Sequence, residues 1–98
     1  MATAEVDERA IPRFDQEEKR GVDSPYVVIL YNDDYHTLDE VVHQLLLATG
    51  YSVERCVRIM LEAHTTGRAV AYSGTESECE RVAKILRRIR LQVETDRS

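Results

Sequence analysis

The sequence predicts a small α+β domain with the element order β-α-α-β-α-β, in which a three-stranded antiparallel sheet packs against three helices. A run rich in Val, Ile and Tyr at residues 26–31 is typical of a buried strand, and weaker strand-like runs follow at 68–73 and 91–95. Three further segments repeat apolar residues at helical spacing, and each begins after a Ser or Thr that can cap a helix.

The composition is that of one globular domain without a membrane segment. The chain has 98 residues, 43% of them hydrophobic and 32% charged, with a net charge of -5. The negative charge argues against general nucleic-acid binding, and no apolar run is long enough to cross a bilayer. Residues 1–5 have neither the basic start nor the apolar core of a secretory signal. We therefore expect a cytoplasmic monomer that binds neither nucleic acid nor membranes.

Residues 1–24 are expected to form a flexible, disordered N-terminal extension, and residues 25–98 the folded domain. The extension carries many charges and shows no sustained apolar period, so it cannot bury enough surface to offset its conformational entropy. The pair Ser24-Pro25 marks the boundary, because the residue before a proline is kept out of the helical region.

The first strand, residues 26–31, is followed directly by Asn32, Asp33 and Asp34. Asn and Asp favour turns because their side chains bond to nearby backbone groups, so this segment is expected to turn the chain from strand to helix. No Lys or Arg stands close by in the sequence. The cluster of acceptors is therefore free to receive a cation from elsewhere.

The first helix is predicted from Thr37 to Thr49, with Thr37 and Glu40 forming a capping box and Gly50 ending it. One apolar face recurs along it, made of Leu38, Val41, Val42, Leu45 and Leu46.

The second helix is predicted to be capped by Ser52, to run to about Thr65, and to end at Gly67. Its apolar face consists of Val53, Cys56, Val57, Met60 and Leu61. The next position on that face is His64, four residues after Met60, which places Met60, Ala63 and His64 side by side near the helix end. A lone histidine on an apolar face is by default a satisfied core residue.

The rest of the chain predicts a short strand at 68–73, a third helix from Thr75 to about Arg90, and a last strand at 91–95. Thr75 and Glu78 form a second capping box. The buried face of the third helix is expected to contain Cys79, Val82, Ala83, Leu86 and Ile89. Its basic residues are better explained as a solvated face than as an RNA-binding stripe, because no aromatic residues interleave with them.

Little in the sequence favours catalysis. Cys56 and Cys79 are expected to be two buried free thiols, since they are widely spaced and form no CxxC pair. His43 is expected at the surface, and Asp39 and His43 point away from the apolar face, so they do not make a convincing metal site. No serine or cysteine sits in a glycine-rich nucleophile elbow. We therefore expect that the protein is not an enzyme and that it binds no cofactor and no metal.

Four groups of residues together resemble one known family. These groups are Val27 to Tyr35, Val53-Glu54-Arg55, Met60 to His64, and Gly67 to Val70. With Asn-Asp-Asp, Met-x-x-x-His and Gly-x-Ala at these separations, the chain resembles ClpS, the bacterial adaptor that delivers N-degron substrates to the Clp protease. The same module recurs in some eukaryotic ubiquitin ligases. The resemblance extends from residue 26 to about residue 95.

The resemblance implies an adaptor that binds proteins with a bulky hydrophobic first residue (Phe, Tyr, Trp or Leu) and hands them to a Clp AAA+ unfoldase through a ClpA- or ClpC-type N-terminal domain. It implies that Asn32, Asp33 and His64 hold the α-amino group of the substrate. A protonated amine has three donors and one charge, which suits a carboxylate, an amide oxygen and a neutral ring nitrogen. By motif position, the pocket for the first side chain would be lined by His36, Leu38, Val41, Met60, Ala63 and Leu91.

Two departures from the family pattern stand out. The family commonly has Thr-Pro-Met after the tyrosine, where this chain has His36-Thr37-Leu38, and Ala63 stands where a valine is frequent. Both departures touch the side-chain pocket, so ligand preference cannot be transferred directly. Two other functions compete: a protein-interaction domain similar to the C-terminal domain of the ribosomal stalk protein, and a small metal-dependent enzyme. A stalk-like domain would need neither the acceptor cluster nor His64.

Overall fold

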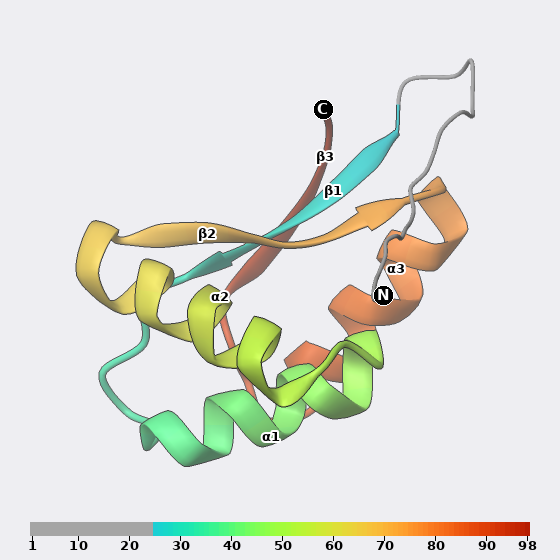
Figure 1. Ribbon diagram of the computed structural model, residues 1–98. Helices are drawn as coiled ribbons and strands as arrows, with labels where there is room; N and C mark the ends of the chain where they lie inside the picture. The colour runs from blue at the N-terminus through green and yellow to red at the C-terminus, as the bar shows by residue number, and fades with distance from the viewer. Residues whose placement is uncertain (1–24) are drawn as a thin grey trace, which may run out of the picture.

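The computed structural model describes residues 25–98; the extension predicted for residues 1–24 lies outside the described residues. Its six elements, shown in Figure 1, follow the predicted order: β1 (Tyr26–Tyr31), α1 (Leu38–Thr49), α2 (Val53–Thr66), β2 (Arg68–Gly74), α3 (Glu76–Arg87) and β3 (Val93–Arg97). The predicted α+β fold is confirmed.

The sheet is antiparallel, with the strand order β2-β1-β3. The first strand is central because it is the most apolar of the three and contributes two fully buried side chains, Val28 and Leu30. The register between β1 and β2 shifts after Val28, which pairs with Tyr72, so that Ile29 pairs with Val70. This β-bulge leaves one residue of β2 without a partner and bends that strand.

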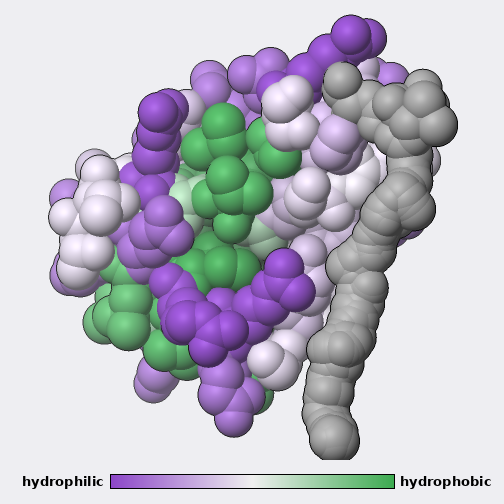
Figure 2. Space-filling model, turned by 45° about the horizontal axis from the view of Figure 1, so that its top comes forward, coloured by the Kyte–Doolittle hydropathy of each residue, from purple (hydrophilic) through white to green (hydrophobic). Residues whose placement is uncertain are grey.

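All three helices lie on one face of the sheet (Figure 1). Leu45, Cys56 and Leu86 come from the three helices in turn and are essentially inaccessible to solvent. On the opposite face, Val70 is about half exposed at 53% and pairs with the partly exposed Ile29. Figure 2, in which the top of Figure 1 comes forward, shows hydrophobic side chains gathered on this side and bordered by hydrophilic ones.

The helix boundaries follow the predicted caps. Thr37 and Thr75 each form a complete capping box, with Glu40 and Glu78 respectively, and the Ser52 side chain accepts from the backbone N–H of Arg55. Gly50 and Gly67 end α1 and α2 with φ values of 72° and 99°. Positive φ is the region in which glycine avoids the steric cost that a Cβ imposes.

The end of the third helix differs from the prediction. We expected α3 to reach Arg90 and the last strand to start at Leu91, but α3 ends at Arg87 and β3 starts at Val93. Arg90 adopts a φ of 66°, and its N–H donates to the carbonyl of Arg87 at 2.9 Å. This tight turn cuts the helix short and directs Leu91, which is only 3% exposed, back into the core.

Two assignments on the apolar face of α2 are wrong. Leu61 and Val53 are 44% and 55% exposed, whereas Ile59, absent from the predicted face, is 8% exposed. The covered face is thus rotated relative to the expected one, since the packing of α2 against β2 decides which residues are covered. In α1, the polar Gln44 is also buried, and its side-chain amide donates to the carbonyl of Ile85 at 2.8 Å.

Other sequence expectations agree with the structure. Cys56 and Cys79 are both buried free thiols, and His43 is exposed. Within residues 25–98, the helices lack the length and apolar character that crossing a membrane requires.

Candidate functional site

The segment Asn32–His36 is held at its start by two neighbouring parts of the fold. The backbone N–H of Tyr31 donates to the carbonyl of Gln92 at 3.0 Å, and the N–H of Asn32 donates to the carbonyl of Gly67 at 2.9 Å. The first bond ties the end of β1 to the segment before β3, and the second ties it to the loop between α2 and β2. These two bonds fix the position at which the chain leaves β1 and enters the segment that carries the acceptors.

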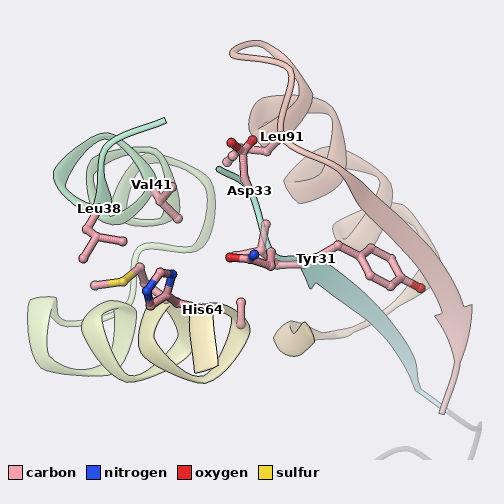
Figure 3. Close-up of a pocket in the computed structure, with 10 residues that line it drawn as sticks. Tyr31, Asp33, Leu38, Val41, His64 and Leu91 are labelled. Carbon is pink, nitrogen blue, oxygen red and sulfur yellow. The ribbon is translucent and has the colours of Figure 1, made fainter. Parts of the chain in front are cut away.

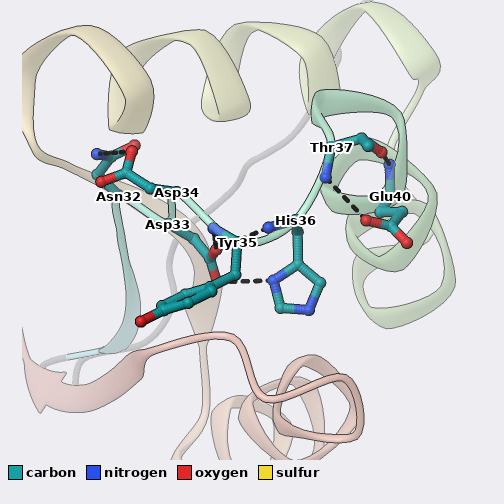
Figure 4. A network of polar contacts seen from close by, with 7 residues as sticks. All are labelled: Asn32, Asp33, Asp34, Tyr35, His36, Thr37 and Glu40. Atoms are coloured by element: carbon teal, nitrogen blue, oxygen red, sulfur yellow. Dashed lines mark hydrogen bonds and ion pairs between the residues drawn. The ribbon is translucent and has the colours of Figure 1, made fainter.

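Asp33 organises the turn that follows. Figure 4 shows its carboxylate bonded to its own loop: Oδ1 accepts from the backbone N–H groups of Tyr35 at 2.6 Å and His36 at 3.0 Å, and Oδ2 lies 2.7 Å from Nδ1 of the His36 ring. The Asn32 side-chain nitrogen donates to Oδ1 of Asp34 at 3.3 Å. This is the turn chemistry expected of Asn and Asp, and it directs the chain into the cap of α1.

These contacts move the pKa values of Asp33 and His36 apart. Partial burial opposes ionisation of Asp33, but the backbone N–H groups of His36 and Tyr35, together with the His36 ring, lower its pKa below the ordinary value. The hydrogen bond that the His36 ring donates to Asp33 raises the pKa of His36, although partial burial of the ring acts against it. Asp33 is thus an anion at neutral pH, and His36 holds its proton to a higher pH than an ordinary histidine.

A small cavity lies between this turn, α1 and α2. Of residues 25–98, ten line it (Figure 3): Leu30, Tyr31, Asn32, Asp33, Leu38, Val41, Met60, Ala63, His64 and Leu91. Its volume is about 10 Å³, which leaves room for roughly one water molecule. Most of its wall is apolar, and Asn32, Asp33 and His64 supply the polar groups.

His64 lies at the mouth of this cavity rather than in the core. It sits in the last turn of α2 and is exposed, while Met60 and Ala63 on the same helix face are buried at 7% and 3% exposure. The interpretation of His64 as a satisfied core residue is therefore wrong. The helix ends three residues later at Gly67, so the core no longer covers this face at His64.

The structure brings together most of the residues predicted for the site. Asn32, Asp33 and His64 line one cavity with five of the six predicted pocket residues. The sixth, His36, does not line it, because its ring turns to Asp33. In Figure 3, the His64 ring and the Asp33 carboxylate stand apart, with the side chains of Leu38 and Val41 on α1 nearby.

Leu30 and Tyr31 also line the cavity, although the sequence did not predict this. Both belong to β1, whose run of apolar residues indicated burial without showing which of them would border a cavity. Their position immediately before Asn32, at the end of the strand, was the available signal.

Metal-dependent chemistry receives no support from the geometry. Within residues 25–98, His, Cys, Asp and Glu side chains form no group of three or more that could hold a metal ion. Cys79 is buried, and this burial raises the pKa of its thiol to about 11, so it is a poor nucleophile at neutral pH.

Comparison with known proteins identifies the family. The family model described as ATP-dependent Clp protease adaptor protein ClpS matches residues 22–94. This chain therefore belongs to the ClpS family.

Curated relatives agree with this assignment. An ATP-dependent Clp protease adapter protein ClpS from Streptomyces avermitilis is 39% identical over 59 residues, which are 60% of this chain and 56% of that protein. The protein of the same name from Edwardsiella ictaluri is 33% identical over 79 residues, covering 79% of this chain and 74% of that protein. A chloroplastic relative, CLPS1 of Arabidopsis thaliana, is 35% identical and is covered over 47% of its length. The chain thus spans about half the length of some of its relatives.

A solved structure shares the fold. Agrobacterium tumefaciens ClpS2 bound to L-phenylalaninamide superposes with a TM-score of 0.71 at 27% sequence identity, over 76% of this chain and 98% of that one.

Proposed function

We propose that this protein is an adaptor of the Clp protease that binds proteins through a free, bulky hydrophobic first residue. The observation that carries the proposal is the joint lining of one cavity by Asn32, Asp33, His64 and an apolar wall. A ligand with a cationic amine next to an apolar side chain needs this combination of an acceptor cluster and an apolar pocket. The L-phenylalaninamide bound by the structural neighbour has both features and supports the proposal.

The amine would be held by three acceptors of different kinds. Asp33 supplies the negative charge, Asn32 an amide oxygen, and His64 a ring nitrogen in its neutral form. The Asn32 amide nitrogen is already engaged with Asp34, which leaves the oxygen as the group to offer. Each charge-assisted hydrogen bond contributes about 1.5–3 kcal/mol.

The first side chain of the substrate would enter between α1 and α2. A cavity of about 10 Å³ does not admit an aromatic ring, so the wall must yield. Met60 is flexible, and Leu38 is 43% exposed at the first position of α1. These two side chains can therefore move with the smallest loss of packing energy. After the costs of opening and association, two or three good contacts leave a dissociation constant of about a micromolar, which suits an adaptor that must release its cargo.

The partner in delivery would be a Clp AAA+ unfoldase, engaged through a ClpA- or ClpC-type N-terminal domain. Residues 1–24 would be needed for delivery and not for recognition. The protein would act as a cytoplasmic monomer with no cofactor and no catalytic activity of its own.

A binding titration tests the proposal. A peptide that begins with Phe should bind the full chain at least about tenfold more tightly than the same peptide with an acetylated N-terminus, because acetylation removes the charge and the donors. Equal binding of the two peptides would refute the amine site. Asp33→Asn should abolish the difference, since it keeps an acceptor oxygen but removes the charge. Asp34→Asn is the matched control, because Asp34 is exposed and does not line the cavity, and the Asn side chain keeps an oxygen that can accept from the Asn32 amide nitrogen.

A further inference from the structure

The carboxylate on which the proposed amine site depends is already engaged. A carboxylate offers about four acceptor positions, and Asp33 uses three of them within its own loop. Two of these positions, both on Oδ1, accept from backbone N–H groups, which carry no charge that changes with pH. The third is taken on Oδ2 by the His36 ring, which can change its charge. A ligand amine would therefore have to share Asp33 with a titratable group.

His36 is well placed to act on this carboxylate. Its Nδ1 lies 2.7 Å from Oδ2, and the side chains of His36 and Asp33 are only 18% and 9% exposed. Among residues 25–98, the Glu40 carboxylate of α1 and the backbone of Ile89, in the segment after α3, also favour the protonated ring. The ring therefore lies among acceptors, and Asp33 is the one in direct contact with it.

The hydrogen bond between the two residues can persist in both charge states of the ring. A neutral imidazole donates from Nδ1 as one of its two tautomers, and an imidazolium donates from the same atom. In the neutral state, Asp33 keeps a full negative charge for a ligand. In the protonated state, the pair is neutral overall, and an approaching ammonium group meets a like charge beside its acceptor.

We propose that His36 is a positioning residue that holds Asp33 in place and sets how much of its negative charge a ligand amine can use. The affinity for peptides with a free hydrophobic N-terminus should accordingly fall when His36 becomes protonated. This inference rests on the proposed function.

The direction and range of the effect follow from the contacts. The bond with Asp33 raises the pKa of His36, so its protonation begins above the ordinary histidine value of about 6.5. On the alkaline side, binding should decline as the peptide amine loses its proton near about pH 8. The expected optimum is therefore narrow and lies on the alkaline side of neutrality, between the two titrations.

The first test measures the dissociation constant of a Phe-initiated peptide for the full chain from about pH 5.5 to 8.5. His36→Asn is the comparison, because the Asn amide can donate to Asp33 from nearly the position of Nδ1 but carries no charge. The ratio of the two dissociation constants at each pH cancels the titration of the peptide amine and every other pH effect that the two proteins share. We expect the dissociation constant of the wild-type protein, divided by that of the variant, to rise by about threefold to tenfold from the alkaline to the acidic end of this pH range. This is the size expected for a partly screened charge pair.

A constant ratio across this range would overturn the inference and leave the proposed function intact. A wild-type protein that binds no Phe-initiated peptide at any pH would overturn the proposed function and this inference with it.

A second test needs no variant and remains valid if His36→Asn fails to fold. Linkage requires that, if protonation of His36 weakens peptide binding by some factor, the peptide raises the acid dissociation constant of His36 by the same factor, so that its pKa falls by the logarithm of that factor. NMR titration of the imidazole protons, free and saturated with peptide, measures this directly. The imidazole signals of His43, which is exposed and does not line the cavity, serve as an internal reference for the pH of each sample. An unchanged pKa of His36 on saturation would refute the proposal.

Discussion

The backbone N–H of Asn32 donates to the carbonyl oxygen of Gly67 at 2.9 Å, which joins the start of the acceptor loop to the end of the helix that carries His64. Gly67 also closes that helix, because its own N–H donates to the carbonyl of Ala63 at 3.0 Å. One glycine thus ends α2 and fixes the two halves of the proposed amine site relative to each other.

The first prediction concerns this glycine. Gly67→Ala should destabilise the fold by about 1–2 kcal/mol, because a φ of 99° is strained for any residue with a Cβ, although the added atom meets nothing within 4 Å. It should also weaken binding of a Phe-initiated peptide. Gly50→Ala is the matched control: its φ is 72° and its surroundings are equally open, but it lies away from the cavity. Chemical denaturation and peptide titration should show a stability loss in both variants and an affinity loss in the first alone. Equal affinities would show that this junction does not position the site.

A second prediction separates binding from folding at His64. His64→Ala should weaken binding of a Phe-initiated peptide by about tenfold or more, the value of one charge-assisted contact. The free energy of unfolding should change by no more than about 0.5 kcal/mol, because the side chain is exposed. His43→Ala, also exposed and helical, should change neither quantity. A large loss of stability without a loss of affinity would assign His64 a structural role.

A third prediction concerns ligand choice. Phe, Tyr and Trp should bind at least as well as Leu as first residues, because Ala63 leaves more room than a valine, and Val and Ile should bind poorly because branching at Cβ crowds the acceptors. Ala63→Val should shift the preference toward Leu by up to about 1–2 kcal/mol. Ala48→Val overpacks the core away from the cavity and is the control for general destabilisation. The idea fails if Ile and Phe bind equally, or if Ala63→Val leaves the ranking unchanged.

The last prediction divides recognition from delivery. Deleting residues 1–24 should leave peptide affinity unchanged, since residues of the folded domain already supply the acceptors and the apolar wall of the cavity. Degradation of a Phe-initiated substrate by the partner protease should nevertheless stop. A reaction with purified unfoldase and peptidase measures this, with the full chain as control. Normal degradation with the shortened protein would assign the segment a solubilising role.

Much of the fold could be predicted from local sequence because its signals are local. Capping boxes at Thr37 and Thr75 and glycines at 50 and 67 act over three or four residues, so they define helix ends without reference to the rest of the chain. The end of α3 escaped prediction because the basic residues after Arg87 suit a helix as well as a turn. Packing of Leu91 into the core favours the turn.

Part of the site could be predicted from the sequence. The resemblance to the ClpS family implied Asn32, Asp33 and His64, and the periodicity of α2 placed Met60 and Ala63 beside His64. The second step needs only local sequence, because helix geometry is the same in every fold.

The orientation of these side chains, their hydrogen-bond partners and the volume of the cavity depend on the tertiary structure. It placed His64 at a solvent-exposed mouth, turned His36 away from the cavity and onto Asp33, and closed the cavity to about 10 Å³. The physical reason is that each of these outcomes depends on contacts between separate elements. Burial, the sharing of hydrogen bonds and free volume arise only when the helices pack against the sheet and against each other.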